Sequence, residues 1–89
     1  SMTKKTNLVL GRLYKLGWAL DWNLTHSGKE VKLNEGECLV FLSENYDHPV
    51  LTVVFLSPKF DETVECTFLF RKPDDFSLGL HPFEEVNDE

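Results

Sequence analysis

The chain alternates between short runs of strand-forming residues and polar segments rich in Gly, Pro, Asn and Asp. Period-two alternation, or unbroken apolarity over four to eight residues, is typical of β-strands, and the polar segments between such runs mark turns. On this basis the pattern predicts strands over residues 8–16, 37–42, 50–56, 63–70 and 80–86. The sequence therefore predicts an all-β domain of five short antiparallel strands.

Two of these strands carry patterns that also predict burial. Val50–Leu56 is apolar except at Thr52, and such a run indicates burial on both faces. Thr63–Phe70 alternates, which places one set of apolar side chains on a single face: Val64, Cys66, Phe68 and Phe70. The turn Ser57–Glu62 separates the two runs, so we expect them to pair as a hairpin.

The remaining segments are expected to be loops or tails. Within the long excursion Gly17–Glu30, Trp18–Trp22 alternates and predicts a short strand or an irregular hairpin arm. Ser43–Pro49 is expected to form an acidic turn, and Arg71–Gly79 a loop with one helical turn near residues 74–78. Residues 1–7 and 87–89 lack a pattern and are expected to be a disordered tail and an acidic tail, leaving 8–86 as one domain.

The order of these parts resembles that of an SH3-like barrel. Gly17–Glu30 corresponds to the family's first, RT-type loop, and Val31–Leu42 resembles its diverging turn, with Gly36 between two apolar runs. Gly79–Val86 is similar to the closing segment, which has a Gly-Leu-aliphatic-Pro pattern. A looser likeness is to small SH3-like proteins of tailed bacteriophages. The resemblance implies a small five-stranded antiparallel barrel.

The residues that form the SH3 peptide groove are not matched in this chain. Leu10–Leu16 offers Tyr14 as its only aromatic residue, and Val50 begins the strand that starts with tryptophan in the family. Glu84 and Glu85 stand where the family has Asn and Tyr. Recognition of proline-rich peptides depends on those aromatic walls, so the resemblance implies a fold and no ligand.

The net charge of −6 is unevenly distributed along the 89 residues. Residues 1–33 carry six basic groups against two acidic ones, and residues 34–89 carry the remaining three basic and thirteen acidic groups. The total disfavours bulk nucleic-acid binding, which rewards positive surface. Two alternatives remain open: single-stranded nucleic acid on a local basic face, and mimicry of a phosphate backbone by the acidic segment. The basic face would comprise Lys4, Lys5, Arg12, Lys15, Lys29 and Lys32.

No pattern of residues indicates catalysis, a cofactor or a metal. His26, His48 and His81 fall in expected loops without ligand spacing, and the sequence contains no Cys-x-x-Cys. Cys38 and Cys66 lie in strand-like runs, which favours reduced, buried thiols over a disulfide. We therefore expect no enzyme activity. A secretory signal and an apolar run long enough to span a bilayer are both missing, which favours a cytoplasmic location.

The aromatic residues offer the best candidates for a contact with a partner. Trp18 and Trp22 lie four residues apart in the longest irregular segment, and with Tyr14 or Tyr46 they would form an aromatic platform. The alternative is that the tryptophans pack onto the barrel as a lid. The leading hypothesis is a non-catalytic protein–protein interaction module that uses Gly17–Glu30 and Ser43–Pro49. Homodimerisation by pairing of an uncovered edge strand, such as Val50–Leu56, is a further alternative.

Overall fold

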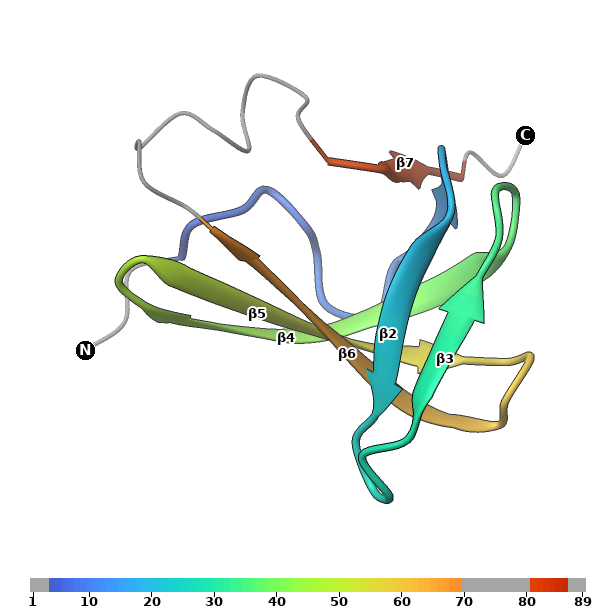
Figure 1. The fold of residues 1–89 in the computed structure, drawn as a ribbon. Coiled ribbons are helices and arrows are strands. Elements are labelled where there is room, and N and C mark those ends of the chain that lie inside the picture. Colours follow the sequence, from blue (N-terminus) through green and yellow to red (C-terminus); the bar gives the residue numbers. More distant parts are fainter. Residues whose placement is uncertain (1–3, 70–80, 87–89) are drawn as a thin grey trace.

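A computed structural model describes residues 4–69 and 81–86, which form one antiparallel sheet of seven strands that curls into a half-barrel (Figure 1). Their order across the sheet is β3-β2-β6-β5-β4-β1-β7. The described residues contain no helix. The strands are β1 (Leu13–Leu16), β2 (Leu20–Leu24), β3 (Glu30–Leu33), β4 (Cys38–Asp47), β5 (Val50–Ser57), β6 (Glu62–Leu69) and β7 (Phe83–Glu85). The all-β prediction is therefore confirmed.

The predicted count of five strands is wrong because two further strands are present: β2 lies within the excursion Gly17–Glu30, and β3 begins at its last residue, Glu30. β2 pairs with β3 from Leu20↔Leu33 to Asn23↔Glu30, and it also pairs with β6 at Leu24↔Val64. The predicted hairpin arm around Trp22 is confirmed. The turn between β2 and β3 contains Gly28 at φ +77°, a conformation that side-chain-bearing residues rarely adopt.

The predicted acidic turn Ser43–Pro49 is also wrong over most of its length. Ser43–Asp47 continues β4 and pairs with β5 as far as Asp47↔Val50, so only His48 and Pro49 form the turn. A shift of register between Phe41 and Ser43 marks a bulge in β4. Polar side chains hide the strand from a hydrophobicity pattern, although the segment still alternates between exposed and half-buried positions.

The central strand β5 is buried on one face, which contradicts the expected burial on both faces. Leu51, Val53 and Phe55 are fully buried, whereas Val50 and Leu56 are 36% and 39% exposed. β5 lies between β4 and β6, so it is also not an edge strand. The predicted hairpin with β6 is confirmed, since Leu51, Val53 and Phe55 lie opposite the predicted inward set of β6: Phe68, Cys66 and Val64.

The core is centred on the ring of Phe55. Its centroid lies 4.8 Å from that of Phe83, 5.3 Å from Phe41, 5.6 Å from Trp22 and 6.2 Å from Tyr14. These partners come from β7, β4, β2 and β1, so one side chain connects most of the sheet. Burial of each large apolar side chain contributes about 1.5–3 kcal/mol to folding.

Both ends of the predicted domain differ from expectation. The first strand begins at Leu13 rather than Leu8, after a turn in which Gly11 has φ +82°. The last strand is limited to 83–85. Within the expected tail, Thr6 is buried, so residues 4–7 are not a loose tail. The other expectations at the ends lie outside the described residues: Phe70, the loop 71–79 with its helical turn, and the acidic tail 87–89.

Candidate functional site

The four aromatic residues selected from the sequence do not form one platform. Tyr14 and Trp22 are 4% and 1% exposed and belong to the core, so neither offers its ring to a partner, which corrects their selection. Tyr46 is half-buried. Trp18 is 49% exposed. The lid alternative thus holds for Trp22, whereas Trp18 remains accessible.

The physical reason for this split is the strand period. Tyr14 and Trp22 occupy inward positions of β1 and β2, where alternation directs side chains into the core. The Tyr14 hydroxyl accepts a hydrogen bond from the backbone N–H of Val9 at 2.9 Å. Within the described residues the Trp22 Nε1–H has no hydrogen-bond partner. Trp18 precedes β2 and lies in the β1–β2 loop, where alternation does not constrain its direction.

The loop that carries Trp18 is fixed by backbone hydrogen bonds on two sides. The N–H of Gly17 donates to the carbonyl of Pro82 at 2.7 Å, just before β7. Leu16 accepts from the N–H of Gly36 at 2.8 Å and donates to the carbonyl of Glu37 at 3.0 Å, in the β3–β4 turn. A Cβ at Gly17 would lie 2.7 Å from Oε2 of Glu84, so the β1–β2 loop and β7 approach closely here. Trp18 therefore projects from a well-supported loop.

Carboxylates are prominent in the segments that support this loop. Glu35 is exposed in the β3–β4 turn, where the Glu37 carboxylate accepts a hydrogen bond from the N–H of Asn34 at 2.7 Å. Glu37 also lies 3.4 Å from Nζ of Lys59, and Glu84 lies 3.9 Å from Nζ of Lys15. We call Trp18, Glu35, Glu37 and Glu84 the Trp18 surface.

A second arrangement lies on the inward face of the β4 extension. Residues 4–8, here called the N-terminal strap, contact β4 chiefly through the carboxylate of Glu44. Its Oε2 accepts from the backbone N–H groups of Lys5 and Thr6 at 2.6 and 3.3 Å. Its Oε1 accepts from Nζ of Lys4 at 2.9 Å and from the Thr6 hydroxyl at 2.5 Å. Leu8 completes the strap and is 1% exposed.

Aromatic rings flank this carboxylate. Nζ of Lys4 lies 5.3 Å from the ring centroid of Phe41, and Nζ of Lys5 lies 4.8 Å from that of Tyr46. Both distances allow cation–π attraction. Burial alone would raise the pKa of Glu44, but the hydrogen bonds from Thr6, Lys4 and Lys5 outweigh it and lower the pKa. No sequence pattern singled out Glu44, and the one signal for it was its inward position in the alternation of Ser43–Asp47.

The thiols and imidazoles do not assemble into a reactive group. Cys38 and Cys66 are unpaired and half-buried. Burial, with the charge of Asp21 adding to it, raises the pKa of the Cys66 thiol to about 11, so this thiol is protonated at neutral pH. Burial lowers the pKa of His81, whose Nδ1 accepts a hydrogen bond from the N–H of Phe83 at 3.0 Å. In residues 4–69 and 81–86 no group of three or more His, Cys, Asp or Glu residues is placed to hold a metal ion.

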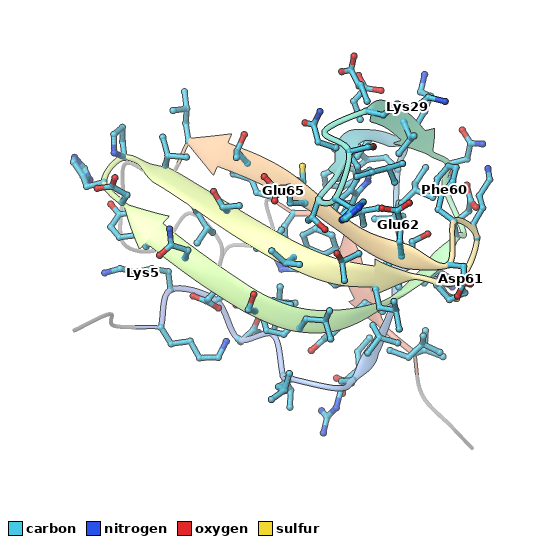
Figure 2. The ribbon with its side chains drawn as sticks, turned by 90° about the horizontal axis from the view of Figure 1, so that it is seen from below. Lys5, Lys29, Phe60, Asp61, Glu62 and Glu65 are labelled. Atoms are coloured by element: carbon cyan, nitrogen blue, oxygen red, sulfur yellow. The ribbon has the colours of Figure 1, made fainter. Side chains whose placement is uncertain are left out.

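The basic residues of the first third are dispersed. Figure 2 shows Lys5 and Lys29 at opposite ends of the molecule. Arg12 pairs with Glu85, and Lys4 and Lys15 pair with carboxylates described above. These ion pairs leave little free positive charge on β1 or the strap. The described part of the chain also has no apolar helix long enough to cross a bilayer.

Comparison with protein-family models, with curated proteins and with solved structures gives no match to this chain.

Proposed function

We propose that this chain is a non-catalytic protein–protein interaction module on an SH3-like barrel, and that it binds its partner through the Trp18 surface. The observation that carries the proposal is the 49% exposure of Trp18 on a loop fixed from both sides. Exposed tryptophans are enriched among residues that dominate binding energy. A loop that is already ordered loses little conformational entropy when it binds.

The carboxylates of the segments that support the Trp18 loop indicate the chemistry of the partner. Glu35 is exposed, Glu84 makes an exposed ion pair with Lys15, and Glu37, which also accepts from the N–H of Asn34, makes a long one with Lys59. Exposed pairs of this kind contribute about 0–1 kcal/mol and are easily exchanged. A partner with an apolar cleft for the indole and basic groups at its rim fits this surface, and the net charge of −6 favours its approach. We place this interaction in the cytoplasm.

The test is capture of a partner by the wild-type chain and by two variants, with the captured proteins identified by mass spectrometry. Trp18→Ala should lose the partner, since removal of a hot-spot side chain costs about 2 kcal/mol or more. Leu69→Ala is the matched control, because Leu69 is also exposed, at 62%, but lies at the end of β6. Equal capture by Trp18→Ala and wild type would contradict the proposal.

The nucleic-acid alternatives have less support. The basic residues are dispersed, with Lys5 and Lys29 at opposite ends of the molecule, whereas single-stranded nucleic acid needs a continuous basic groove. Mimicry of a phosphate backbone also has less support, because the Glu44 side chain is only 11% exposed and is bound by the strap. Retention on a single-stranded nucleic-acid column at low salt, lost as salt is raised, would favour nucleic-acid binding over our proposal.

A further inference from the structure

We propose that the N-terminal strap occupies, in cis, a binding site for an extended, lysine-bearing peptide segment. The site consists of Phe41, Glu44 and Tyr46 on the inward face of β4 and is called the Glu44 site below. This inference rests on the proposed function, because it names the chemistry of a segment that an interaction module would bind. It uses a different surface from Trp18, so the two proposals can fail separately.

The contacts of the strap show which features of a peptide the Glu44 site recognises. Two successive backbone N–H groups, of Lys5 and Thr6, point at one carboxylate oxygen, a contact that any non-proline sequence can make. The ammonium of Lys4 and the hydroxyl of Thr6 bind the other oxygen. The aromatic rings of Phe41 and Tyr46 select for the lysines. The site thus recognises an extended segment in which two successive lysines are followed by a residue with a hydroxyl group.

The receiving carboxylate is shielded from water, which strengthens these contacts. The side chain of Glu44 is only 11% exposed, whereas that of Lys4 is 52% exposed. Hydrogen bonds to a charged acceptor are stronger than those between neutral groups, and more of their strength is retained where water is excluded. The carboxylate therefore belongs to the sheet and is covered by the strap, of which Thr6 and Leu8 are buried and Lys4 stays half exposed.

The strap is attached as a ligand would be, not as a strand. Within the described residues, no backbone–backbone hydrogen bond outside the strands joins residues 4–8 to another element, and none of these residues is in a strand. Its polar contacts to the sheet converge on Glu44, and Leu8 provides the apolar contact. Release of the strap leaves every strand pair of the sheet intact. It also removes the lysine ammonium groups from the rings of Phe41 and Tyr46.

The covalent connection explains why this site would be masked. The strap joins β1 through residues 9–12, which make a turn closed by the hydrogen bond from the N–H of Arg12 to the carbonyl of Val9 at 3.1 Å. A short tether gives the strap an effective concentration on the order of millimolar at its site. A free segment must exceed that concentration or bind more tightly, so the strap acts as an autoinhibitory contact.

The test is fluorescence anisotropy with a labelled peptide of sequence Lys-Lys-Thr-Asn-Leu-Val, which repeats residues 4–9. The full-length wild type should bind it weakly. The full-length double variant Lys4→Ala, Thr6→Val weakens the cis contact but keeps Leu8 and Glu44. It should bind the peptide at least about tenfold more tightly, a change that corresponds to 1.4 kcal/mol. Lys59→Ala, which removes a lysine paired with Glu37 elsewhere, should bind as the wild type does.

Two further arms identify the site. Adding Glu44→Gln to the double variant should abolish the gain, and a peptide with glutamate in place of both lysines should not bind. A double variant that binds no more tightly than wild type would overturn the inference, and so would a gain that survives Glu44→Gln. Trp18→Ala in the double variant should leave peptide binding unchanged. If Trp18→Ala loses the partner while the double variant gains peptide binding, both proposals stand. If Trp18→Ala still captures the partner while the double variant gains peptide binding, only the Trp18 surface is rejected.

Discussion

At the scale of single residues, Glu44 and Cys66 show how two buried acids end with pKa shifts of opposite sign. Both side chains are withdrawn from water, which on its own raises the pKa of each. Glu44 receives four donors from the strap, which reverse the effect. Cys66 faces the additional negative charge of Asp21, and its pKa stays high. The donors, and not the burial, decide which of the two is charged.

The lowered pKa of Glu44 predicts a pH-dependent contribution to stability. A group whose pKa is lower in the folded state stabilises the fold above its unfolded pKa, ordinarily 4.5, and loses that contribution as pH falls through the folded value. Glu44→Gln should therefore lower the free energy of unfolding by about 1.5–3 kcal/mol at pH 7, and by progressively less below pH 4.5. Urea denaturation between pH 3 and 7 measures the free energy of unfolding of the wild type and of Glu44→Gln.

Glu84→Gln is the matched control, because its carboxylate is 60% exposed and its pair with Lys15 is loose, at 3.9 Å. It should change stability by no more than about 1 kcal/mol, with little dependence on pH. If the free energies of unfolding of wild type and Glu44→Gln differ by the same amount down to pH 3, the carboxylate charge does not hold the strap.

The raised pKa of Cys66 predicts slow reaction with thiol reagents. A rise from 9.0 to about 11 is two units, which reduces the thiolate fraction about a hundredfold at pH 8. In a Cys38→Ser chain, the reaction of Cys66 with a disulfide reagent should be slower by about that factor than in the same chain unfolded by urea. Equal rates in the two states would show that the folded sheet neither buries this thiol nor raises its pKa.

At the scale of elements, the sequence predicts strands well where apolar residues define the period and poorly where polar residues do. β5 and β6 are predicted with their pairing, because Val53 and Cys66 belong to clear apolar sets. Ser43–Asp47 is a strand whose inward positions include Glu44, so hydrophobicity does not reveal it. The strap shows no alternation of apolar and polar residues, and its contacts with Glu44 span 38–40 residues of sequence, beyond any local pattern. The second arrangement was therefore not predictable, whereas Trp18 was.

The β3–β4 turn, which is hydrogen-bonded to the residues before Trp18, depends on the backbone conformation of Gly36. Gly36 has φ +89°, and a Cβ there would meet nothing within 4 Å. Gly36→Ala should therefore destabilise the protein through backbone strain alone, by about 1–2 kcal/mol. Gly36→Asn should cost less, because asparagine tolerates this conformation. Thermal denaturation compares the variants, and an Ala variant as stable as wild type would mean that the turn adopts another conformation.

At the scale of the whole molecule, the sheet is open, and its two edges decide whether copies associate. In the described sheet the edges are β3 and β7, not Val50–Leu56 as the sequence suggested. β7 has only three residues, and β3 has four, with exposed Glu30 and Lys32. Short edges with charged side chains oppose strand pairing between chains, because pairing would bring those charges together out of water. The net charge of −6 adds repulsion between copies.

These features predict a chain that stays monomeric, with a mass of 10.3 kDa at every concentration in sedimentation equilibrium. Replacing both edge charges, Glu30→Val with Lys32→Val, should produce association that rises with concentration, because an uncharged edge accepts a neighbouring strand. Lys59→Val is the control, since Lys59 lies in the β5–β6 turn away from either edge. Association of the wild type would contradict this prediction. A monomeric double variant would show that edge length, not charge, protects the sheet, because a four-residue strand offers too few backbone groups to hold a second chain.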